Sequence, residues 1–357
     1  MKYLFFTNTP AHVHLYRHAV ETLRERGHDV LVLGRDYGCT RALLEYHDLP
    51  HEIYGKCETT KFSLFRELPE QYLEIFRRAR RYRPDLIFGV GSYAAHAGAL
   101  TRTPVVVVAD SEPTTIDHVV SRPFVDTFLT PHTFGKDLGA KHYEFRGFKE
   151  LAYLHPDVYE PDPTIREQLG VGPDEEFVIV RFNAFGSHHD VGHSGFSPEK
   201  RRQLVSALSE RATVFVSDEG GNPAPDDARP FDLHPARLHD ALAEASLLVA
   251  DTQTMVTEAA LLGTPAIRSN SFVGESDMGN FLELEREGLI DNFRDFEDVL
   301  GKSLTILADD SAKERLRARR DEYLADKVNL TDVIVDVATK AAPTTKPIER
   351  TVAVSRR

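Results

Sequence analysis

Short apolar runs alternate with amphipathic stretches along the first half of the chain. The run KYLFFT at residues 2–7 precedes a polar turn, and DVLVLG at residues 29–34 is the next apolar run. Between them, apolar residues recur at helical spacing: Val13, Tyr16, Val20 and Leu23. Gly27 follows this stretch and predicts the end of a helix. The order strand, helix, strand is that of a β-α-β unit.

The same alternation continues to about residue 131 and restarts at residue 177. Further strands are expected at residues 51–54, 85–90, 104–110, 125–131, 177–182, 213–218, 246–251 and 264–269. Helices are expected within residues 62–82 and at 93–100, 198–211, 235–245, 254–262 and 278–287. Strands rich in Val, Ile and Leu that alternate with helices form parallel sheets covered on both faces. We therefore predict an α/β fold of two Rossmann-like domains.

The length of 357 residues fits two domains rather than one. Residues 155–176 contain four prolines and several acidic residues, so they are expected to connect the domains. This places the N-terminal domain at residues 1–154 and the C-terminal domain at 177–339. The tail at 340–357 lacks helical periodicity and is expected to be disordered. Two domains facing each other leave a cleft, which is a usual place for a ligand.

Composition excludes several classes of partner and compartment. The formal net charge is −13, from 56 acidic and 43 basic residues, so nucleic acid is not expected as a partner. The two cysteines, Cys39 and Cys57, are isolated and show neither metal spacing nor a disulfide framework. No apolar stretch approaches the ~20 residues of a membrane helix. We expect a cytoplasmic protein, and its acidic, lysine-poor surface suits a high-salt cytoplasm.

The clearest candidate for ligand binding is the segment ASLLVADTQTMVTEAALLGTPAIR at residues 245–268. An apolar run ends at Asp251, and the polar turn Thr252, Gln253 and Thr254 opens a helix that carries Glu258. The free N–H groups at a helix start favour a pyrophosphate. Glu258 could then bind the hydroxyls of a ribose. An ordinary β-α-β turn with a capping threonine explains the same residues.

This segment resembles the nucleotide-binding segment of the glycosyltransferase-B fold, which the non-hydrolysing UDP-N-acetylglucosamine 2-epimerases share. The matching positions are Asp251, Thr252, Gln253, Thr254, Glu258, Ala259, Leu262, Gly263 and Pro265. The resemblance places Glu258 on the family's ribose-binding glutamate. Gln253 and Thr254 stand where that family has two glycines, which narrows the room for phosphate.

The opening of the chain resembles a second family. TPAHVHLYRHAV at residues 9–20 and GVGSYAAHAGAL at 89–100 are similar to two loops of the lipid-linked N-acetylglucosaminyltransferase of peptidoglycan synthesis. The resemblance places His12 beside the acceptor, where an imidazole could deprotonate a hydroxyl. A ligand-positioning or structural His12 stays open. His14 and Tyr93 belong to the same two loops and are candidate substrate-binding residues.

Asp110 and Glu112 lie just past the apolar run at residues 104–110 and two residues apart. Such a pair could share a proton, bind the hydroxyls of a sugar, or cap the next helix. The 2-epimerases have an aspartate in the preceding loop, where this chain has GVGSY. This absence argues against plain epimerase chemistry.

Over residues 1–300 the sequence is similar to a family of archaeal and bacterial proteins known as domain of unknown function 354. The shared motifs are NTPAHVH, DSE followed by RPFVDTFLTP, GFKELAYLHP and DTQTMVTEAALLGTPAIRSN. The family is related to glycosyltransferase-B proteins. Its reaction does not follow from the resemblance.

A histidine-rich loop, RFNAFGSHHDVGHSG at residues 181–195, follows the first strand expected in the second domain. His188 and His189 could contact a phosphate or a sugar, contribute to a metal site, or belong to a hydrogen-bonded structural loop. We expect no metal, because helix termini and arginines such as Arg181 and Arg268 can supply positive charge. The arginine-rich helix within residues 62–83 could touch an anionic membrane, although such helices more often pack on a sheet.

These features favour a glycosyltransferase that moves a sugar from a nucleotide diphosphate to a glycan, polysaccharide or lipid-linked acceptor. The candidate catalytic residues are His12, Asp110 and Glu112. No cofactor is expected beyond the nucleotide sugar that serves as substrate. The alternatives are a UDP-N-acetylglucosamine 2-epimerase-like enzyme and a non-catalytic nucleotide-sugar-binding protein.

Overall fold

The computed structural model describes residues 1–56, 61–183, 195–274 and 277–340, with the main chain only at 61–66. The chain divides into two compact units. Unit 1 comprises Met1–Tyr159 and the chain from Lys327 onward, and unit 2 comprises Glu160–Asp326.

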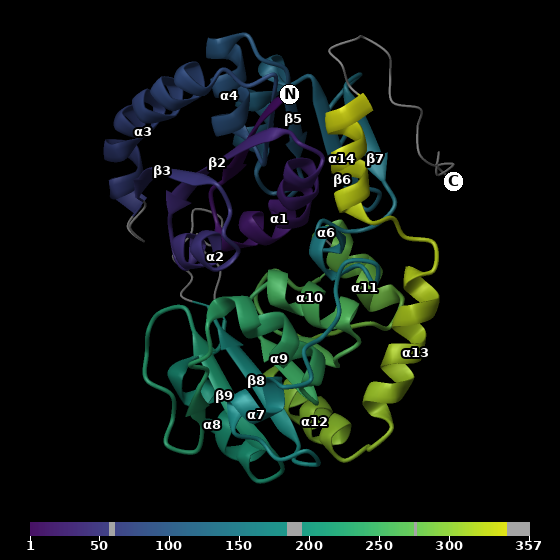
Figure 1. Ribbon diagram of the computed structural model, residues 1–357. Helices are drawn as coiled ribbons and strands as arrows, with labels where there is room; N and C mark the ends of the chain where they lie inside the picture. Colours follow the sequence, from purple (N-terminus) through teal and green to yellow (C-terminus); the bar gives the residue numbers. More distant parts are fainter. Residues whose placement is uncertain (57–60, 184–194, 275–276, 341–357) are drawn as a thin grey trace. The chain divides into compact units, whose positions relative to one another are not determined.

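Unit 1 is built on a parallel sheet with the strand order β3-β2-β1-β4-β5-β6-β7 (Figure 1). The strands are β1 (Lys2–Thr7), β2 (Asp29–Asp36), β3 (His51–Lys56), β4 (Leu86–Gly89), β5 (Val105–Val108), β6 (Thr127–Pro131) and β7 (His142–Phe145). The order reverses between β1 and β4. Ligands of open α/β sheets bind beyond the carboxyl ends of the strands at such a point.

Helices cover both faces of this sheet. They are α1 (Pro10–Glu25), α2 (Thr40–Tyr46), α3 (Lys61–Tyr82), α4 (Ser92–Thr101), α5 (Thr115–Ser121), α6 (Leu151–Leu154) and α14 (Leu330–Lys340), with a 3-10 turn at Arg122–Phe124. Alternate side chains of β1 point to opposite faces. Phe5 packs on Tyr16 of α1 with ring centroids 5.2 Å apart. Leu4 and Phe6 join the core cluster formed with α3 and α4.

Unit 2 repeats the same topology, with the strand order β10-β9-β8-β11-β12-β13. Its strands are β8 (Phe177–Phe182), β9 (Thr213–Asp218), β10 (Arg229–Pro230), β11 (Leu247–Ala250), β12 (Ala266–Arg268) and β13 (Asp291–Asn292). Its helices are α7 (Ile165–Leu169), α8 (Pro198–Ser209), α9 (Leu238–Glu244), α10 (Thr254–Leu262), α11 (Gly279–Arg286), α12 (Phe296–Leu307) and α13 (Ala312–Leu324), with a 3-10 turn at Pro235–Arg237. The order reverses between β8 and β11, so the loops that follow these two strands lie at the second switch point.

The predicted fold class is confirmed, because both sheets are parallel and each is interleaved with helices.

A glycine ends helix α10 and allows its close packing on α13. Gly263 adopts φ +74°, and a Cβ at this position would lie 3.3 Å from the backbone of Arg317. Only glycine fits both the left-handed conformation and the close approach to α13.

The domain boundaries differ from the predicted ones at two places. Residues from Glu160 onward belong to unit 2, where α7 packs against α9 instead of forming a linker. Residues 330–339 were expected in the second domain, but they form most of helix α14, which packs on α1 and α6 of unit 1. Two buried hydrogen bonds hold it there: the Tyr3 hydroxyl donates to the carbonyl of Ala338 at 2.8 Å, and Thr331 Oγ1 donates to the carbonyl of Ala152 at 2.7 Å. The predicted tail, apart from Lys340, lies outside the described residues.

Candidate functional site

His12 lies in the first turn of α1, directly after β1 and at the switch point of unit 1. Its Nδ1 accepts a hydrogen bond from the main-chain N–H of Asn8 at 3.2 Å. A neutral imidazole has one protonated nitrogen, so this hydrogen bond places the proton on Nε2. His12 therefore presents a hydrogen-bond donor at Nε2, whereas a general base would need a free lone pair there.

Burial lowers the pKa of His12 to about 3, and the positive charges of Lys149 and Arg35 act in the same direction. The negative charge of Asp110 opposes them. His12 is consequently neutral at pH 7. A neutral imidazole fits the general base that the sequence predicts. The proton on Nε2, however, makes His12 a hydrogen-bond donor at that atom.

Asp110 and Lys149 form an ion pair at the same edge of the sheet. Lys149 Nζ lies 2.5 Å from Asp110 Oδ2 and 3.8 Å from Glu150 Oε1. The side chain of Lys149 is 13% exposed and that of Asp110 is 21% exposed. Lys149 was missed as a site residue, although it lies in the motif GFKELAYLHP. Its contact with Asp110 joins residues about forty positions apart and leaves no local signal.

Glu112 has hydrogen-bond partners in the loop that follows β6. Its Oε1 accepts from the N–H of Gly135 at 3.4 Å, and its carbonyl accepts from Lys136 Nζ at 2.5 Å. Neither Asp110 nor Glu112 caps the next helix, because Thr114 is the N-cap residue of α5 and no side chain caps it. Glu112 thus fixes the loop that follows β6, and the shared-proton hypothesis stays a prediction.

The two other candidates in unit 1 have different surroundings. His14 is buried on the packed face of α1, with its ring 5.4 Å from the ring of Tyr153. Tyr93 is partly buried at the start of α4 and stacks on Tyr72 at 5.3 Å. Only Tyr93 lies at the carboxyl edge with His12, and His14 has the environment of a core residue.

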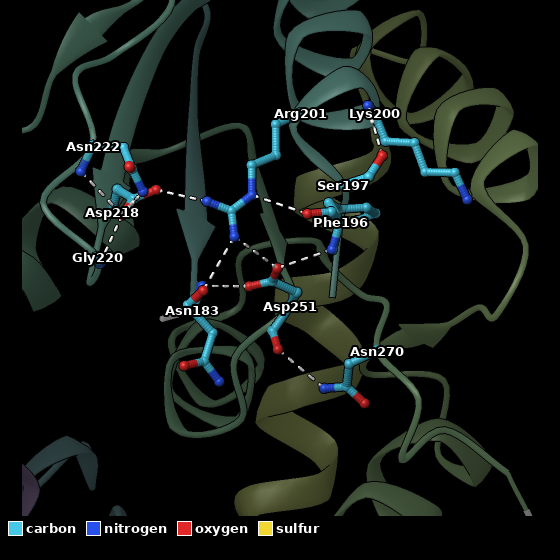
Figure 2. A network of polar contacts seen from close by, with 10 residues as sticks. All are labelled: Asn183, Phe196, Ser197, Lys200, Arg201, Asp218, Gly220, Asn222, Asp251 and Asn270. Carbon is cyan, nitrogen blue, oxygen red and sulfur yellow. Dashed lines mark hydrogen bonds and ion pairs between the residues drawn. The ribbon is translucent and has the colours of Figure 1, made fainter. Parts of the chain in front are cut away.

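Asp251 follows β11 at the switch point of unit 2 and is fully buried. Its Oδ1 accepts from the N–H of Asn183 at 2.6 Å, and its Oδ2 accepts from the N–H of Phe196 at 3.2 Å (Figure 2). Arg201 lies beside it and donates to Asp218 Oδ2 at 2.8 Å. One carboxylate therefore holds the chain after β8 and the chain before α8 at the same point.

Burial raises the pKa of Asp251 from its usual 3.8 to about 6, although the two amide donors and Arg201 act in the opposite direction. The folded state thus binds this proton more tightly than the unfolded state. The stability that the group contributes is fully present below pH 3.8 and is lost as the pH rises through 6.

We expect wild-type protein to lose about 2–3 kcal/mol of unfolding free energy relative to Asp251→Asn between pH 4 and pH 7.5. The variant has no carboxyl group to titrate at this position, so it provides the reference. Urea unfolding at a series of pH values measures the difference. A difference that stays constant with pH would contradict the raised pKa.

The turn after Asp251 has the features of an anion site. The Thr252 hydroxyl is buried, and no residue in the described part of the chain gives it a hydrogen-bond partner. Gln253 is the N-cap residue of α10 and makes no side-chain cap, and the first turn of α10 contains no acidic residue. The first N–H groups of a helix have no partner within it, and its dipole favours an anion. The capping threonine proposed as the alternative is not observed.

Glu258 is directed away from this turn. Its Oε1 lies 3.1 Å from His239 Nε2 of α9, and both side chains are almost completely buried. Oε1 of Glu258 is thus engaged by His239, and the ribose-binding role that the resemblance implies stays a prediction.

Neither predicted arginine is directed at the α10 turn. Arg181 donates to Ser217 Oγ at 2.5 Å and to Glu219 Oε1 at 2.6 Å, beside β9. Arg268 is fully buried, with its guanidinium 3.6 Å above the ring of Phe281 and an ion pair to Asp277. Burial lowers the pKa of Arg268 to about 9. These contacts link β12 to α11 but leave Nη1 buried without a hydrogen-bond partner among the described residues, so the phosphate contact of Arg268 stays a prediction.

The histidine-rich loop and the metal and membrane predictions remain to be considered. His188 and His189 lie outside the described residues, so the histidine-rich loop keeps its three interpretations. Within the described ranges, no group of three or more His, Cys, Asp or Glu side chains could hold a metal ion. No helix there is long and apolar enough to cross a membrane.

Comparison with known proteins gives a family and a fold. The model of a family described as "Protein of unknown function (DUF354)" matches residues 2–342, as the shared motifs predict. No curated protein matches the chain.

Solved structures with the same fold include both enzyme classes that the sequence suggests. The UDP-GlcNAc 2-epimerase from Neisseria meningitidis bound to UDP-GlcNAc has a TM-score of 0.65 and 11% identity, with 95% of this chain and 100% of that chain covered. Spinosyn rhamnosyltransferase SpnG complexed with spinosyn aglycone has a TM-score of 0.63 and 14% identity, covering 95% and 99%. The Streptomyces sp. SF2575 glycosyltransferase SsfS6 complexed with thymidine diphosphate has a TM-score of 0.62 and 15% identity, also covering 95% and 99%. At these identities the similarity shows the fold alone.

Proposed function

Since the chain belongs to the DUF354 family, whose function is unknown, we propose its function from its own site: it is a nucleotide-sugar-dependent glycosyltransferase. The proposal rests chiefly on the turn at Thr252. A buried hydroxyl without a described partner lies there beside an uncapped helix start. Together they offer hydrogen-bond donors and a positive dipole to a diphosphate. Structures with this fold that hold UDP-GlcNAc or thymidine diphosphate are consistent with the same ligand class.

The proposal assigns the sugar acceptor to the carboxyl edge of the unit 1 sheet. There the Asp110 carboxylate could accept a proton from the attacking hydroxyl. His12 would donate from Nε2 and orient the oxygen, because its Nδ1 is already bonded to Asn8. Lys149 fixes the Asp110 carboxylate through the ion pair at 2.5 Å. The bond from the sugar to the diphosphate breaks as the bond to the acceptor oxygen forms, and α10 stabilises the leaving diphosphate.

Epimerase chemistry remains the second candidate, because an epimerase structure is as similar as the transferases. One observation in the GVGSY loop bears on it. Asp117 reaches this loop from α5, and its Oδ1 accepts from the N–H of Ser92 at 3.1 Å. Asp117 therefore caps the start of α4, and this hydrogen bond occupies its Oδ1. The transferase therefore remains the favoured proposal, and a purely binding protein is the third possibility.

We expect Thr252→Val to weaken binding of a nucleoside diphosphate about tenfold, since a hydrogen bond to a charged group is lost. The substitution keeps the size of the side chain and removes only its hydroxyl. Calorimetric titration of UDP, dTDP, GDP and ADP into wild type and variant measures the effect.

Thr305→Val is the matched control, because Thr305 is exposed on α12 and its hydroxyl donates to the carbonyl of Gly301. Its affinity should equal that of wild type. The proposal would be wrong if none of the four diphosphates bound wild type, or if both variants bound with the same affinity.

A further inference from the structure

Arg35 is a cation held at the carboxyl edge of the unit 1 sheet, beside the proposed acceptor position. It is the second-last residue of β2, and the pairing register with β3 shifts between Gly34 and Arg35. The shift leaves Tyr54 as an extra residue on β3. Such β-bulges re-aim side chains and occur often beside active sites. The local irregularity thus directs Arg35 and Tyr54 toward the same point.

That point is Asn8, at the carboxyl end of β1. Arg35 Nε donates to the carbonyl of Asn8 at 3.2 Å, and the Tyr54 hydroxyl donates to Asn8 Oδ1 at 2.9 Å. The N–H of Asn8 in turn donates to His12. Arg35 is therefore connected to His12 through one residue.

Two aromatic rings fix the guanidinium of Arg35. Its Cζ lies 5.6 Å from the ring centroid of Tyr37 and 5.9 Å from that of Tyr93. Stacking of this kind restricts the side chain, so little conformational entropy remains to be lost when it binds a ligand. Tyr93 also stacks on Tyr72 at 5.3 Å, which holds the ring in place.

The two terminal nitrogens of the Arg35 guanidinium keep their hydrogen-bonding capacity for a ligand. Nε bonds Asn8, but Nη1 and Nη2 make no hydrogen bond or ion pair with the described residues. The neighbouring Asp36 is already paired with Arg41 at 3.1 Å. A fixed guanidinium fork with two open nitrogens matches the oxygens of a carboxylate or phosphate.

We propose that Arg35, held by Tyr37 and Tyr93, binds an oxyanion of the acceptor, so that the acceptor of this enzyme is a phosphorylated or carboxylated compound. The role as acceptor site rests on the proposed function. The binding of the oxyanion itself does not, because every residue involved lies in unit 1. The positive charge of Arg35 also acts on the pKa of His12, which agrees with a short separation.

Ligand-observed NMR at low salt tests this with three probes: methyl phosphate, methyl glucuronide and neutral methyl glucoside. We expect Arg35→Gln to weaken binding of at least one anionic probe tenfold or more, and Arg41→Gln to leave it within about twofold of wild type. If Arg35→Gln loses binding of methyl phosphate, the group that Arg35 recognises on the acceptor is a phosphate. If it loses binding of methyl glucuronide, that group is a carboxylate. Tyr37→Leu, which loosens the guanidinium without removing it, should have a smaller effect in the same direction and serves as the test if Arg35→Gln does not fold.

The proposal is overturned if neither anion binds wild type, or if Arg35→Gln binds both anions as wild type does. Titration of UDP into the same variant keeps the two proposals apart. Oxyanion binding that depends on Arg35, without any nucleotide binding, would support this inference and reject the proposed function. If UDP binds, and Arg35→Gln binds both anionic probes as wild type does, the result would support the proposed function and reject this inference.

Discussion

Replacing Asp110 by asparagine is expected to lower the rate of sugar transfer about 10²–10⁴-fold, the range typical of removing a group that transfers a proton. The substitution preserves the size of the side chain and removes its charge and basicity. Lys149 keeps Glu150 Oε1 at 3.8 Å as a partner, so the fold at this edge should persist. The rate is measured with the nucleotide sugar and acceptor that wild type consumes.

Two variants make this result specific. Asp126→Asn is the matched control, because Asp126 also pairs with a lysine, Lys141 at 3.6 Å, and accepts from the N–H of Val105 at 3.0 Å. It lies at the amino end of β6 and should leave the rate unchanged. His12→Asn removes the Nε2 donor and keeps an acceptor for Asn8, so it should lower the rate less than Asp110→Asn. The opposite order would identify His12 as the base and reject the role given to Asp110.

Replacing Asp251 by alanine is expected to lower the free energy of unfolding by about 2–3 kcal/mol at pH 7, because two buried amides lose their acceptor. These amides belong to Asn183 and Phe196. Burial disfavours the charged form of Asp251, as its raised pKa shows. Removing this buried charge offsets part of the loss, so the loss stays below the sum of the two amide contributions.

Denaturant unfolding followed by circular dichroism measures this loss. Asp309→Ala provides the comparison, since Asp309 pairs with Arg315 at 2.6 Å on the surface and its side chain is 38% exposed. Exposed ion pairs contribute at most about 1 kcal/mol. Equal losses in the two variants would show that Asp251 does not hold unit 2 together.

The fold was predictable because most of its elements are long enough to show their periodicity. The helix expected at Thr254–Leu262 has those bounds in the structure. Among the elements that were missed are strands β7, β10 and β13 and helices α2, α5, α12 and α13. Strands β10 and β13 have only two residues each, too few to show alternation. Helix α14 shows a clear apolar face, but nothing local indicates that it packs on unit 1, since its partners Tyr3 and Ala152 lie far away in the sequence.

The candidate site was predictable in its loops but not in its contacts. Position after a strand correctly brought His12, Asp110 and Tyr93 to one edge of a sheet. The partner of each side chain depends on tertiary structure: Asn8 sets the tautomer of His12, and Lys149 pairs with Asp110. A charged residue at the end of a strand can also turn inward, as Arg268 does, and the sequence does not distinguish this from a ligand contact.

The most direct test of the proposed transferase follows nucleotide sugars by NMR, with the protein alone and with a mixture of methyl glycosides, sugar phosphates and uronic acids. We predict that at least one UDP- or dTDP-sugar stays unchanged with the protein alone and releases its nucleoside diphosphate when the mixture is present, as a glycoside forms on an anionic member. A sugar that changes configuration without any acceptor would show an epimerase instead. Nucleotide sugars that remain intact under both conditions would likewise contradict the transferase.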